Sequence, residues 1–265
     1  MDIKKIQSKL RTSLFGTNIY YEESLDSTND YAMRLANDGA PEGTIVVTDF
    51  QKSGRGRQTR KWYSTRGQNL LMSLVVRPEL DIEMAQKIAL ATATILITSI
   101  KDFLKNRKIK IEGLEVKWPN DVLLSGKKLG GILVESRLQN KTIKALVIGV
   151  GLNVNSTVRE MPEEIKDKAI TLFDVIGKKI IIEELISLFL KQFEQNYMKF
   201  ERTNYAGVVK TWKKYCHQFG DPIVVKNPVN DETGIFYDVN SEGYLLYKTR
   251  SGETKKLVSG EIERK

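Results

Sequence analysis

Apolar and polar residues recur with two periods along this chain, and together they predict both strands and helices. Runs rich in β-branched residues, typical of buried strands, cover residues 44–50, 69–76 and 143–153. Apolar residues at helical spacing cover residues 82–104, where acids come first and lysines last, and residues 181–202. Shorter helices are expected at residues 3–14, 27–35 and 205–215, and shorter strands at residues 18–23, 114–118, 122–124 and 128–136. The chain therefore combines α and β elements in one large unit.

The pattern changes after Gly220-Asp221-Pro222. Four short strand-like runs follow, separated by Asn, Gly, Asp and Ser turns, at residues 223–226, 234–238, 244–249 and 255–258. This spacing is typical of a small β-barrel of SH3-like size. We therefore expect a domain of residues 1–217 followed by a second domain of residues 218–265.

Composition narrows the class of protein. The 265 residues are 41% hydrophobic and 28% charged, as in an ordinary soluble protein. No apolar run is long enough to span a membrane and no secretory signal precedes the first helix, so we expect a cytoplasmic protein. The net charge of +9 is compatible with nucleic acid, an anionic substrate or an acidic protein partner, and does not separate them.

The chain has one cysteine, Cys216, and one histidine, His217. A single cysteine excludes an intrachain disulfide framework and a structural zinc site. The two residues are sequence neighbours, which rarely face each other, so we interpret both as structural. An enzyme built this way is expected to work by positioning and fixed charge rather than through a covalent nucleophile.

The basic loop, residues 52–66, contains no acidic residue. Its segment G-R-G-R-Q-T-R-K-W, residues 54–62, holds four cations and two glycines. Glycine lets a backbone approach a ligand closely, and arginine offers donors matched to carboxylate and phosphate. The loop alone fits a small anionic ligand about as well as a solvated surface loop or an arm for nucleic acid.

Four other motifs accompany the basic loop. Ser27-Thr28-Asn29 sits at the mouth of a helix, where an ordinary N-cap is the simpler interpretation. K-W-P-N-D, residues 117–121, exposes an amide and a carboxylate after a strand-breaking proline, which a generic hairpin does not need. Glycine pairs interrupt strands in K-K-L-G-G-I-L-V-E, residues 127–135, and in I-G-V-G-L-N, residues 148–153. Glycine weakens a strand and often marks close approach of a ligand. Neither common nucleotide-binding fingerprint is present.

In this order, the motifs resemble those of the biotin protein ligases, from S-T-N at residue 27 to S-G-E-I ending at residue 262. The resemblance implies an α+β catalytic fold, a mixed β-sheet with flanking helices, followed by an SH3-like barrel. It also implies a reaction in two steps. Biotin and ATP first form biotinyl-5′-AMP and pyrophosphate, and a lysine of a biotin carboxyl carrier protein then takes the biotin and releases AMP.

The resemblance carries several expectations about partners. ATP implies Mg²⁺, and the carrier belongs to acetyl-CoA carboxylase or a related biotin-dependent enzyme. Relatives that repress transcription have an N-terminal winged helix-turn-helix, and this chain starts about where their catalytic domain starts, so no DNA binding is expected. A homodimer formed by pairing the central sheets edge to edge remains open.

The resemblance also assigns roles residue by residue. Lys128, Arg57 and Arg60 are the expected catalytic cations, and Asp121 is a candidate metal ligand and a candidate base for the transfer step. The expected ATP or adenylate contacts are Arg60, Trp62, Asn120 and Asn153. The expected biotin contacts are Ser27, Thr28, Asn29, Gln51, Gly54, Arg55, Arg57, Lys128, Gly131, Gly149 and Gly151. Residues 52–68 are expected to close over the adenylate, and the polar segment 155–169 is a candidate second lid.

Two rival interpretations remain at this point. A lipoate or octanoate ligase or transferase shares the fold and can share the chemistry. A basic nucleic-acid-binding module would use the basic loop and the terminal barrel, and it predicts binding that weakens with salt.

Overall fold

A computed structural model describes residues 1–58, 60–78, 84–139, 142–203, 205–226 and 230–264. Its centre is a seven-stranded sheet with the order β1-β2-β3-β7-β6-β5-β4, in which only the β1–β2 pair is parallel. The strands are β1 (Ile19–Glu22), β2 (Ile45–Thr48), β3 (Asn69–Val76), β4 (Leu114–Lys117), β5 (Asp121–Leu124), β6 (Lys127–Gln139) and β7 (Thr142–Asn153). This is the mixed sheet expected from the sequence.

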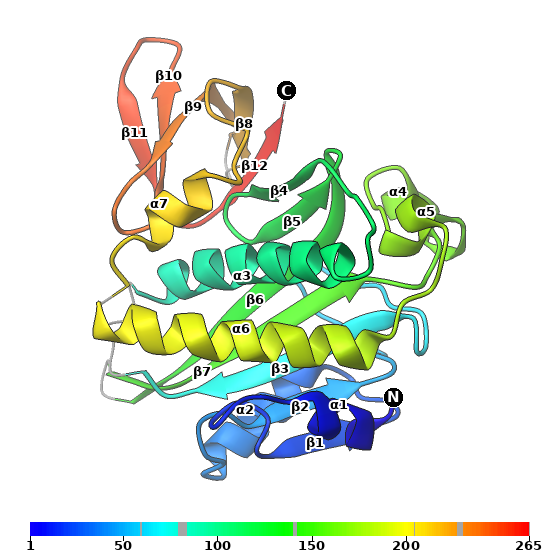
Figure 1. Cartoon of the computed structure of the whole chain (residues 1–265). Coiled ribbons are helices and arrows are strands. Elements are labelled where there is room, and N and C mark those ends of the chain that lie inside the picture. The colour runs from blue at the N-terminus through cyan, green and yellow to red at the C-terminus, as the bar shows by residue number, and fades with distance from the viewer. Residues whose placement is uncertain (59, 79–83, 140–141, 204, 227–229, 265) are drawn as a thin grey trace.

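Helices cover the two faces of this sheet unequally (Figure 1). The long helices α3 (Ala85–Lys105) and α6 (Ile182–Arg202) lie side by side over one face, with α1 (Ile3–Lys9) packed on α6 and α7 (Val208–Lys213) on α3. The short helix α2 (Thr28–Asn37) packs against β2, β3 and β7 on the opposite face. Three further short helices, η2 (Val158–Glu160), α4 (Glu163–Lys166) and α5 (Leu172–Ile176), follow β7.

Strand alternation sends successive side chains to these two faces. On β7, Ile148, Val150 and Leu152 belong to the large core under α3 and α6. The residues that alternate with them face α2, where Val147 joins a small separate cluster with Ala32 and Ala36 of the helix. Because a strand has a period of two, the same segment can stabilise the fold on one face and line a cavity on the other.

The turn between β5 and β6 is the hairpin expected at Ser125-Gly126. Both residues have positive φ, 52° and 77°, as a tight type I′ hairpin turn requires. The hairpin brings Asp121 opposite Gly131, and a bulge near Val122 shifts the register so that Lys128 pairs with Leu123. The turn thus places the start of β6 beside the end of the K-W-P-N-D segment.

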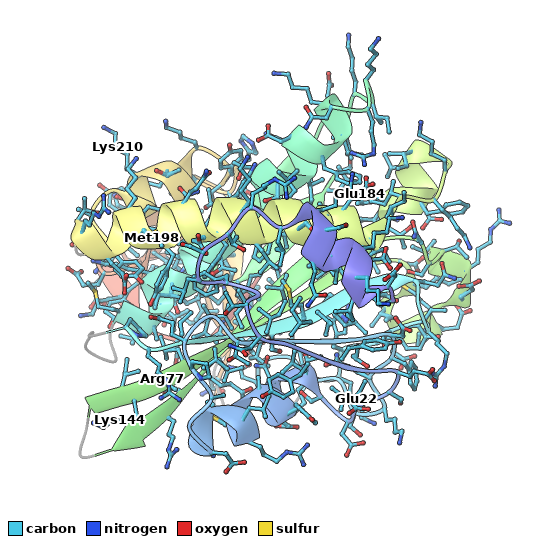
Figure 2. All side chains as sticks on the ribbon, turned by 60° about the horizontal axis from the view of Figure 1, so that its bottom comes forward. Glu22, Arg77, Lys144, Glu184, Met198 and Lys210 are labelled. Atoms are coloured by element: carbon cyan, nitrogen blue, oxygen red, sulfur yellow. The ribbon has the colours of Figure 1, made fainter. Side chains whose placement is uncertain are left out.

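Arg77 helps to fix the α2 side of the sheet, and Figure 2, in which the bottom of Figure 1 comes forward, labels it near Lys144. The guanidinium of Arg77, at the end of β3, donates to the carbonyls of Ala36 and Ala40 at the end of α2 and to that of Lys144 on β7. A cation at a helix C-terminus satisfies carbonyls that have no partner in the helix. Arg77 therefore holds α2 against the sheet.

The C-terminal strands form a second, five-stranded antiparallel sheet with the order β11-β10-β9-β8-β12. They are β8 (Pro222–Lys226), β9 (Glu232–Val239), β10 (Leu245–Thr249), β11 (Thr254–Leu257) and β12 (Glu261–Arg264). Four match the expected runs, and β12 was not expected. The indole Nε1–H of Trp118 donates to the carbonyl of Gly243 at 3.0 Å and links the two sheets.

Other differences from the expected elements are small. The first helix ends at Lys9 rather than at residue 14, and the segment expected to be irregular at 155–169 contains η2 and α4. The acidic start expected for the helix at residues 82–104 lies outside the described residues. No helix within the described residues combines the length and apolar character needed to cross a bilayer.

Candidate active site

A cavity of about 280 Å³ lies on the α2 face of the main sheet, where glycines replace side chains. Gly131 and Gly151 sit directly opposite each other on β6 and β7, and Gly149 is two residues along β7. A Cβ at Gly149 would lie 2.3 Å from Asn29 Oδ1, and one at Gly151 would lie 2.7 Å from the Trp62 indole. Neighbouring side chains thus occupy the space that a larger residue would need. The glycine pairs predicted close approach of a ligand; the groups that approach them here are the side chains of Asn29 and Trp62.

The N-terminus of α2 supplies a hydrogen-bonded floor to the cavity. Ser27 caps the helix, as expected, by accepting from the N–H of Asp30. The N–H and the hydroxyl of Thr28 lie 2.8 and 3.1 Å from Gln51 Oε1. The buried hydroxyl of Ser73 lies 2.8 Å from Thr28 Oγ1. These groups are preorganised, and polar groups at fixed positions are what orients a small ligand.

The side-chain amide of Asn29 makes most of its possible hydrogen bonds with other groups of the protein. Its Nδ2 donates to the Leu133 carbonyl at 3.2 Å and to Glu135 Oε2 at 2.7 Å, while its Oδ1 lies 2.6 Å from the Ser73 hydroxyl. Glu135 also pairs with Arg55, which lies 2.6 Å from Asp30 as well. Asn29 therefore joins α2 to the sheet beneath the cavity.

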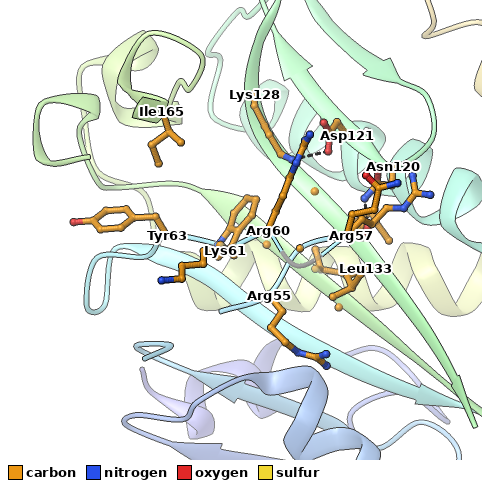
Figure 3. Close-up of a pocket in the computed structure, with 18 of the residues that line it drawn as sticks. Arg55, Arg57, Arg60, Lys61, Tyr63, Asn120, Asp121, Lys128, Leu133 and Ile165 are labelled. Atoms are coloured by element: carbon orange, nitrogen blue, oxygen red, sulfur yellow. Dashed lines mark hydrogen bonds and ion pairs between the residues drawn. The ribbon is translucent and has the colours of Figure 1, made fainter. Parts of the chain in front are cut away.

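Lysine and arginine side chains gather at the other side of the cavity (Figure 3). Lys128 Nζ lies 2.7 Å from Asp121 Oδ1 and 5.8 Å from the centre of the Trp62 ring. Arg57 donates to the Gly260 carbonyl at 3.2 Å, and Arg60 pairs with Glu261. The basic loop thus reaches the second sheet.

Burial lowers the pKa of two cations that line the cavity, Arg57 and Lys117. It lowers the pKa of the Arg57 guanidinium, with Asp121 opposing the shift and Arg60 adding to it. Burial also lowers the pKa of the Lys117 ammonium, again opposed by Asp121 and reinforced by Lys128. Desolvation disfavours the charged forms, and an anion entering the cavity would favour them and so oppose the shift.

Two asparagines expected to touch the nucleotide are held by the backbone. Asn120 Nδ2 donates to the Ile132 carbonyl at 2.5 Å. Asn153 Nδ2 donates to the carbonyls of Lys128 and Ile170, and its Oδ1 accepts from Asn69. Both line the cavity, and both fix the strand ends that carry Lys128.

Trp62 lies over the glycine pair and closes the cavity from above. Its indole approaches the position of a Cβ at Gly151 and, at 3.5 Å, at Gly131. The backbone N–H of Trp62 donates to Gly54, whose own Cβ position lies 2.5 Å from the Trp62 carbonyl. The indole Nε1–H is buried and makes no hydrogen bond to the described part of the chain. Gly54 thus supports the loop, while Trp62 presents a flat ring to the cavity.

The segment after β7 completes the wall. Lys128 N–H donates to the Lys168 carbonyl at 2.8 Å, and the Tyr63 hydroxyl donates to the Glu160 carbonyl at 2.9 Å. The candidate second lid thus contacts both the basic loop and the start of β6.

The structure brings together all but one of the residues selected from the sequence. Gly54 lies outside the cavity lining; the members inside it are Ser27, Thr28, Asn29, Gln51, Arg55, Arg57, Arg60, Trp62, Asn120, Asp121, Lys128, Gly131, Gly149, Gly151 and Asn153. The sequence analysis assigned no role to Lys117 or Tyr63, which also line it, whereas Glu261 belongs to the terminal S-G-E-I motif and Lys168 to the candidate second lid. Lys117 could have been chosen, because it opens the K-W-P-N-D motif.

Cys216 is not part of this site. It is buried outside the cavity lining, and burial raises the pKa of its thiol to about 12. A thiol with so high a pKa is a poor nucleophile, in agreement with a structural role.

A cavity over a glycine-bearing sheet, with hydrogen-bonding groups on one side and cations on the other, is suited to a small polar molecule beside an anionic one. The model of the biotin/lipoate A/B protein ligase family matches residues 21–153. The chain belongs to this family.

Relatives and solved structures agree with this assignment. The bifunctional ligase/repressor BirA of Bacillus subtilis is 33% identical over 98% of this chain and 78% of its own length. The biotin–[acetyl-CoA-carboxylase] ligase of Paracoccus denitrificans is 28% identical over 86% of this chain and 92% of its own length. The biotin protein ligase from Aquifex aeolicus in complex with biotin and ATP superimposes with a TM-score of 0.78 at 28% identity, covering 94% of this chain and all of that one.

Proposed function

We propose that this protein is an ATP-dependent biotin–protein ligase that joins biotin to a lysine of a biotin carboxyl carrier protein through biotinyl-5′-AMP. The observation that carries the proposal is the two-sided cavity. Thr28 and Gln51 offer hydrogen-bonding groups for a small uncharged ring, while Lys128 and the basic loop offer charge for a carboxylate and phosphates.

In the first step an oxygen of the biotin carboxylate attacks the α-phosphorus of ATP. A new bond forms between this oxygen and the phosphorus, and pyrophosphate leaves. Two anions must meet, so the barrier is largely electrostatic and positive charge at the reacting atoms lowers it. Lys128 is the proposed contact to the carboxylate and α-phosphate, with Arg57 beside it, and Arg60 serves the nucleotide phosphates. Trp62 covers the adenylate.

In the second step the carrier lysine attacks the carbonyl carbon of the adenylate, the amide bond forms, and AMP leaves with the bonding electrons. The attacking amine must lose a proton. Asp121 is the proposed acceptor, because its carboxylate already lies 2.7 Å from the ammonium of Lys128. Arrival of the biotin carboxylate at Lys128 would free this carboxylate for the incoming amine.

Mg²⁺ is proposed to enter with ATP rather than through a protein cage. Within the described residues there is no group of three or more acidic, histidine or cysteine side chains that could hold a metal. Mg²⁺ keeps several waters and binds readily through phosphates with one or two carboxylates. Asp121 is the carboxylate proposed to take part.

We further propose that residues 218–265 are a separate domain of the SH3-like barrel type. The support is the five-stranded antiparallel sheet, which forms no strand pair with the main sheet among the described residues. A homodimer would use the outer edge of β1, because the other edge strand, β4, already donates the Val116 N–H to the Tyr215 carbonyl.

The deciding experiment is ATP–pyrophosphate exchange with the purified protein and a single carboxylic acid at a time. Biotin should support exchange, and lipoate and octanoate should not. Exchange with lipoate but not biotin would assign the protein to the other branch of the family, and no exchange with either would refute the proposal. Limited proteolysis within residues 52–68 should slow when biotin and ATP are present, since the adenylate must be shielded from water.

A further inference from the structure

Three cations that line the cavity, Lys128, Arg57 and Arg60, each contact an acceptor from the protein. Lys128 is paired with Asp121, which belongs to the same hairpin. Arg60 is paired instead with Glu261, 201 residues further along the chain. Arg57 donates to the carbonyl of Gly260, the residue before Glu261. Two consecutive residues of the C-terminal sheet thus meet the loop that is proposed to bind phosphates.

Glu261 is held in place by the strand that it begins. The next residue, Ile262, is 1% exposed and belongs to the main core, so the alternation of β12 turns Glu261 the other way, into the cavity lining. Gly260 has a φ of +154°, which favours glycine and lets the chain turn into β12. Among the described strands β12 pairs with β8 alone and ends the second sheet, and its first residues, Glu261 and Ile262, line the cavity.

The carboxylate of Glu261 competes with any phosphate for the same donors. The Arg60 fork binds one planar or tetrahedral anion well, and a second anion beside it would be repelled. The Arg60 side chain is 57% exposed, and pairs at such positions contribute little because water screens them. Glu261 can therefore be displaced by a multiply charged ligand, while it still lowers the affinity for that ligand.

We propose that Glu261 is a displaceable counter-anion of the nucleotide site: it leaves Arg60 when the phosphates of ATP bind and returns to Arg60 as pyrophosphate departs. This inference rests on the proposed ligase function. It gives the C-terminal sheet a defined part in the first step, which is to weaken the hold of the site on both the substrate triphosphate and the leaving pyrophosphate.

The test is the variant Glu261→Gln in biotin-dependent ATP–pyrophosphate exchange. Glutamine keeps the size and one oxygen acceptor but removes the charge. We expect the KM for ATP and the KM for pyrophosphate to fall by the same factor, about two- to fivefold, the range of an ion pair at a partly exposed position. The KM for biotin should not change, because biotin does not contact Arg60 in this scheme.

Glu263→Gln is the matched control. Glu263 lies on the same strand and pairs with Lys226 rather than with the loop, so its loss removes an equal charge without touching Arg60. Its effect on the ATP constants should stay below the effect of Glu261→Gln. In an Arg60→Gln background, Glu261→Gln should have no further effect on either constant.

The outcomes separate the two proposals. Loss of exchange in the wild-type protein would refute the ligase function itself. Wild-type exchange together with an unchanged or raised KM for ATP in Glu261→Gln would refute the counter-anion alone. So would an equal effect of Glu263→Gln, or an effect of Glu261→Gln that persists without Arg60.

Discussion

The two faces of the main sheet are made by the same strands and yet have opposite character. On β7, Ile148 and Val150 lie buried beneath the long helices, while Gly149 and Gly151, which alternate with them, leave the other face open to a cavity. One face is filled with interlocking apolar side chains, which is how stability is obtained. On the other face, glycines leave space where side chains would stand, and polar groups line that space.

The comparison shows that the two requirements are separated at the level of single residues. A site needs space, fixed hydrogen-bonding groups and charges that are not yet neutralised, and each of these weakens a fold. Placing them on alternate positions of strands whose other face is fully packed keeps the site rigid. Changes to neighbouring residues should therefore affect either stability or activity, and seldom both.

The largest effect is expected from Ile148→Ala, on the packed face. Ile148 has no exposed surface and sits in the main core, so truncation leaves a cavity and should lower the free energy of unfolding by about 4 kcal/mol. Urea unfolding would measure this loss. The KM for biotin in the protein that remains folded should match the wild type, and a large rise in KM would contradict the separation of the two faces.

The next effect is expected from Lys128→Ala, on the cavity face. Loss of a cation at the reacting atoms should slow biotin-dependent exchange roughly a hundredfold, or about 3 kcal/mol of transition-state stabilisation. The side chain is partly exposed and its pair with Asp121 is open to water, so the unfolding midpoint should change little. A variant that exchanges at the wild-type rate would remove Lys128 from the mechanism.

The third prediction concerns Glu194, a carboxylate on the packed side, which should contribute to stability rather than to activity. Glu194 of α6 is buried and accepts from the backbone N–H groups of Ser13, Leu14 and Phe15. Burial by itself raises the pKa of the Glu194 carboxyl, but these hydrogen bonds outweigh it and hold the pKa below its ordinary value. Glu194→Gln should cost about 2 kcal/mol of stability at neutral pH, because an amide donor then faces backbone donors.

The pH dependence of this loss has a definite sign. A carboxyl whose pKa is lower in the folded state contributes stability that is fully present above its unfolded pKa and disappears as pH falls through the folded value. The difference between wild type and Glu194→Gln should therefore be constant near neutral pH and shrink in acid. Unfolding curves from pH 7 to pH 3 would measure it. A difference that grows in acid would show that the carboxylate is not the stabilising form.

Much of the packed side could be predicted from the sequence, because its signals are local. The run at residues 69–76 has the same bounds as β3, and the long apolar-periodic segments became α3 and α6. The elements that escaped prediction are short and charged. β12 has four residues, three of them charged, and it becomes a strand only by pairing with β8.

The cavity side was predicted in part, since motifs identify which residues gather but not what they touch. Sequence alone suggested Asn29, Asn120 and Asn153 as ligand contacts, and the structure gives their amides to the protein's own backbone and side chains. These partners lie up to 106 residues away, and no local spacing reveals them. The S-G-E-I motif pointed to Glu261, but its pairing with Arg60, 201 residues away, could not be read from the sequence.

The smallest of these effects is expected from Gly151→Ala, which probes the cavity face of the main sheet directly. The new methyl would lie 2.7 Å from the Trp62 indole, closer than real contacts allow, so the ring must move away from the sheet. The KM for ATP should rise on the order of tenfold, about 1.4 kcal/mol, while stability changes little.

Gly131→Ala is the matched control on the opposite strand, because a methyl there lies 3.5 Å from the same ring and fits without displacement. In the absence of ligands, fluorescence of Trp62 should change in Gly151→Ala and not in Gly131→Ala. Equal spectra in both variants would show that Trp62 does not rest on this glycine, and that the cavity face is not closed by the contact inferred here.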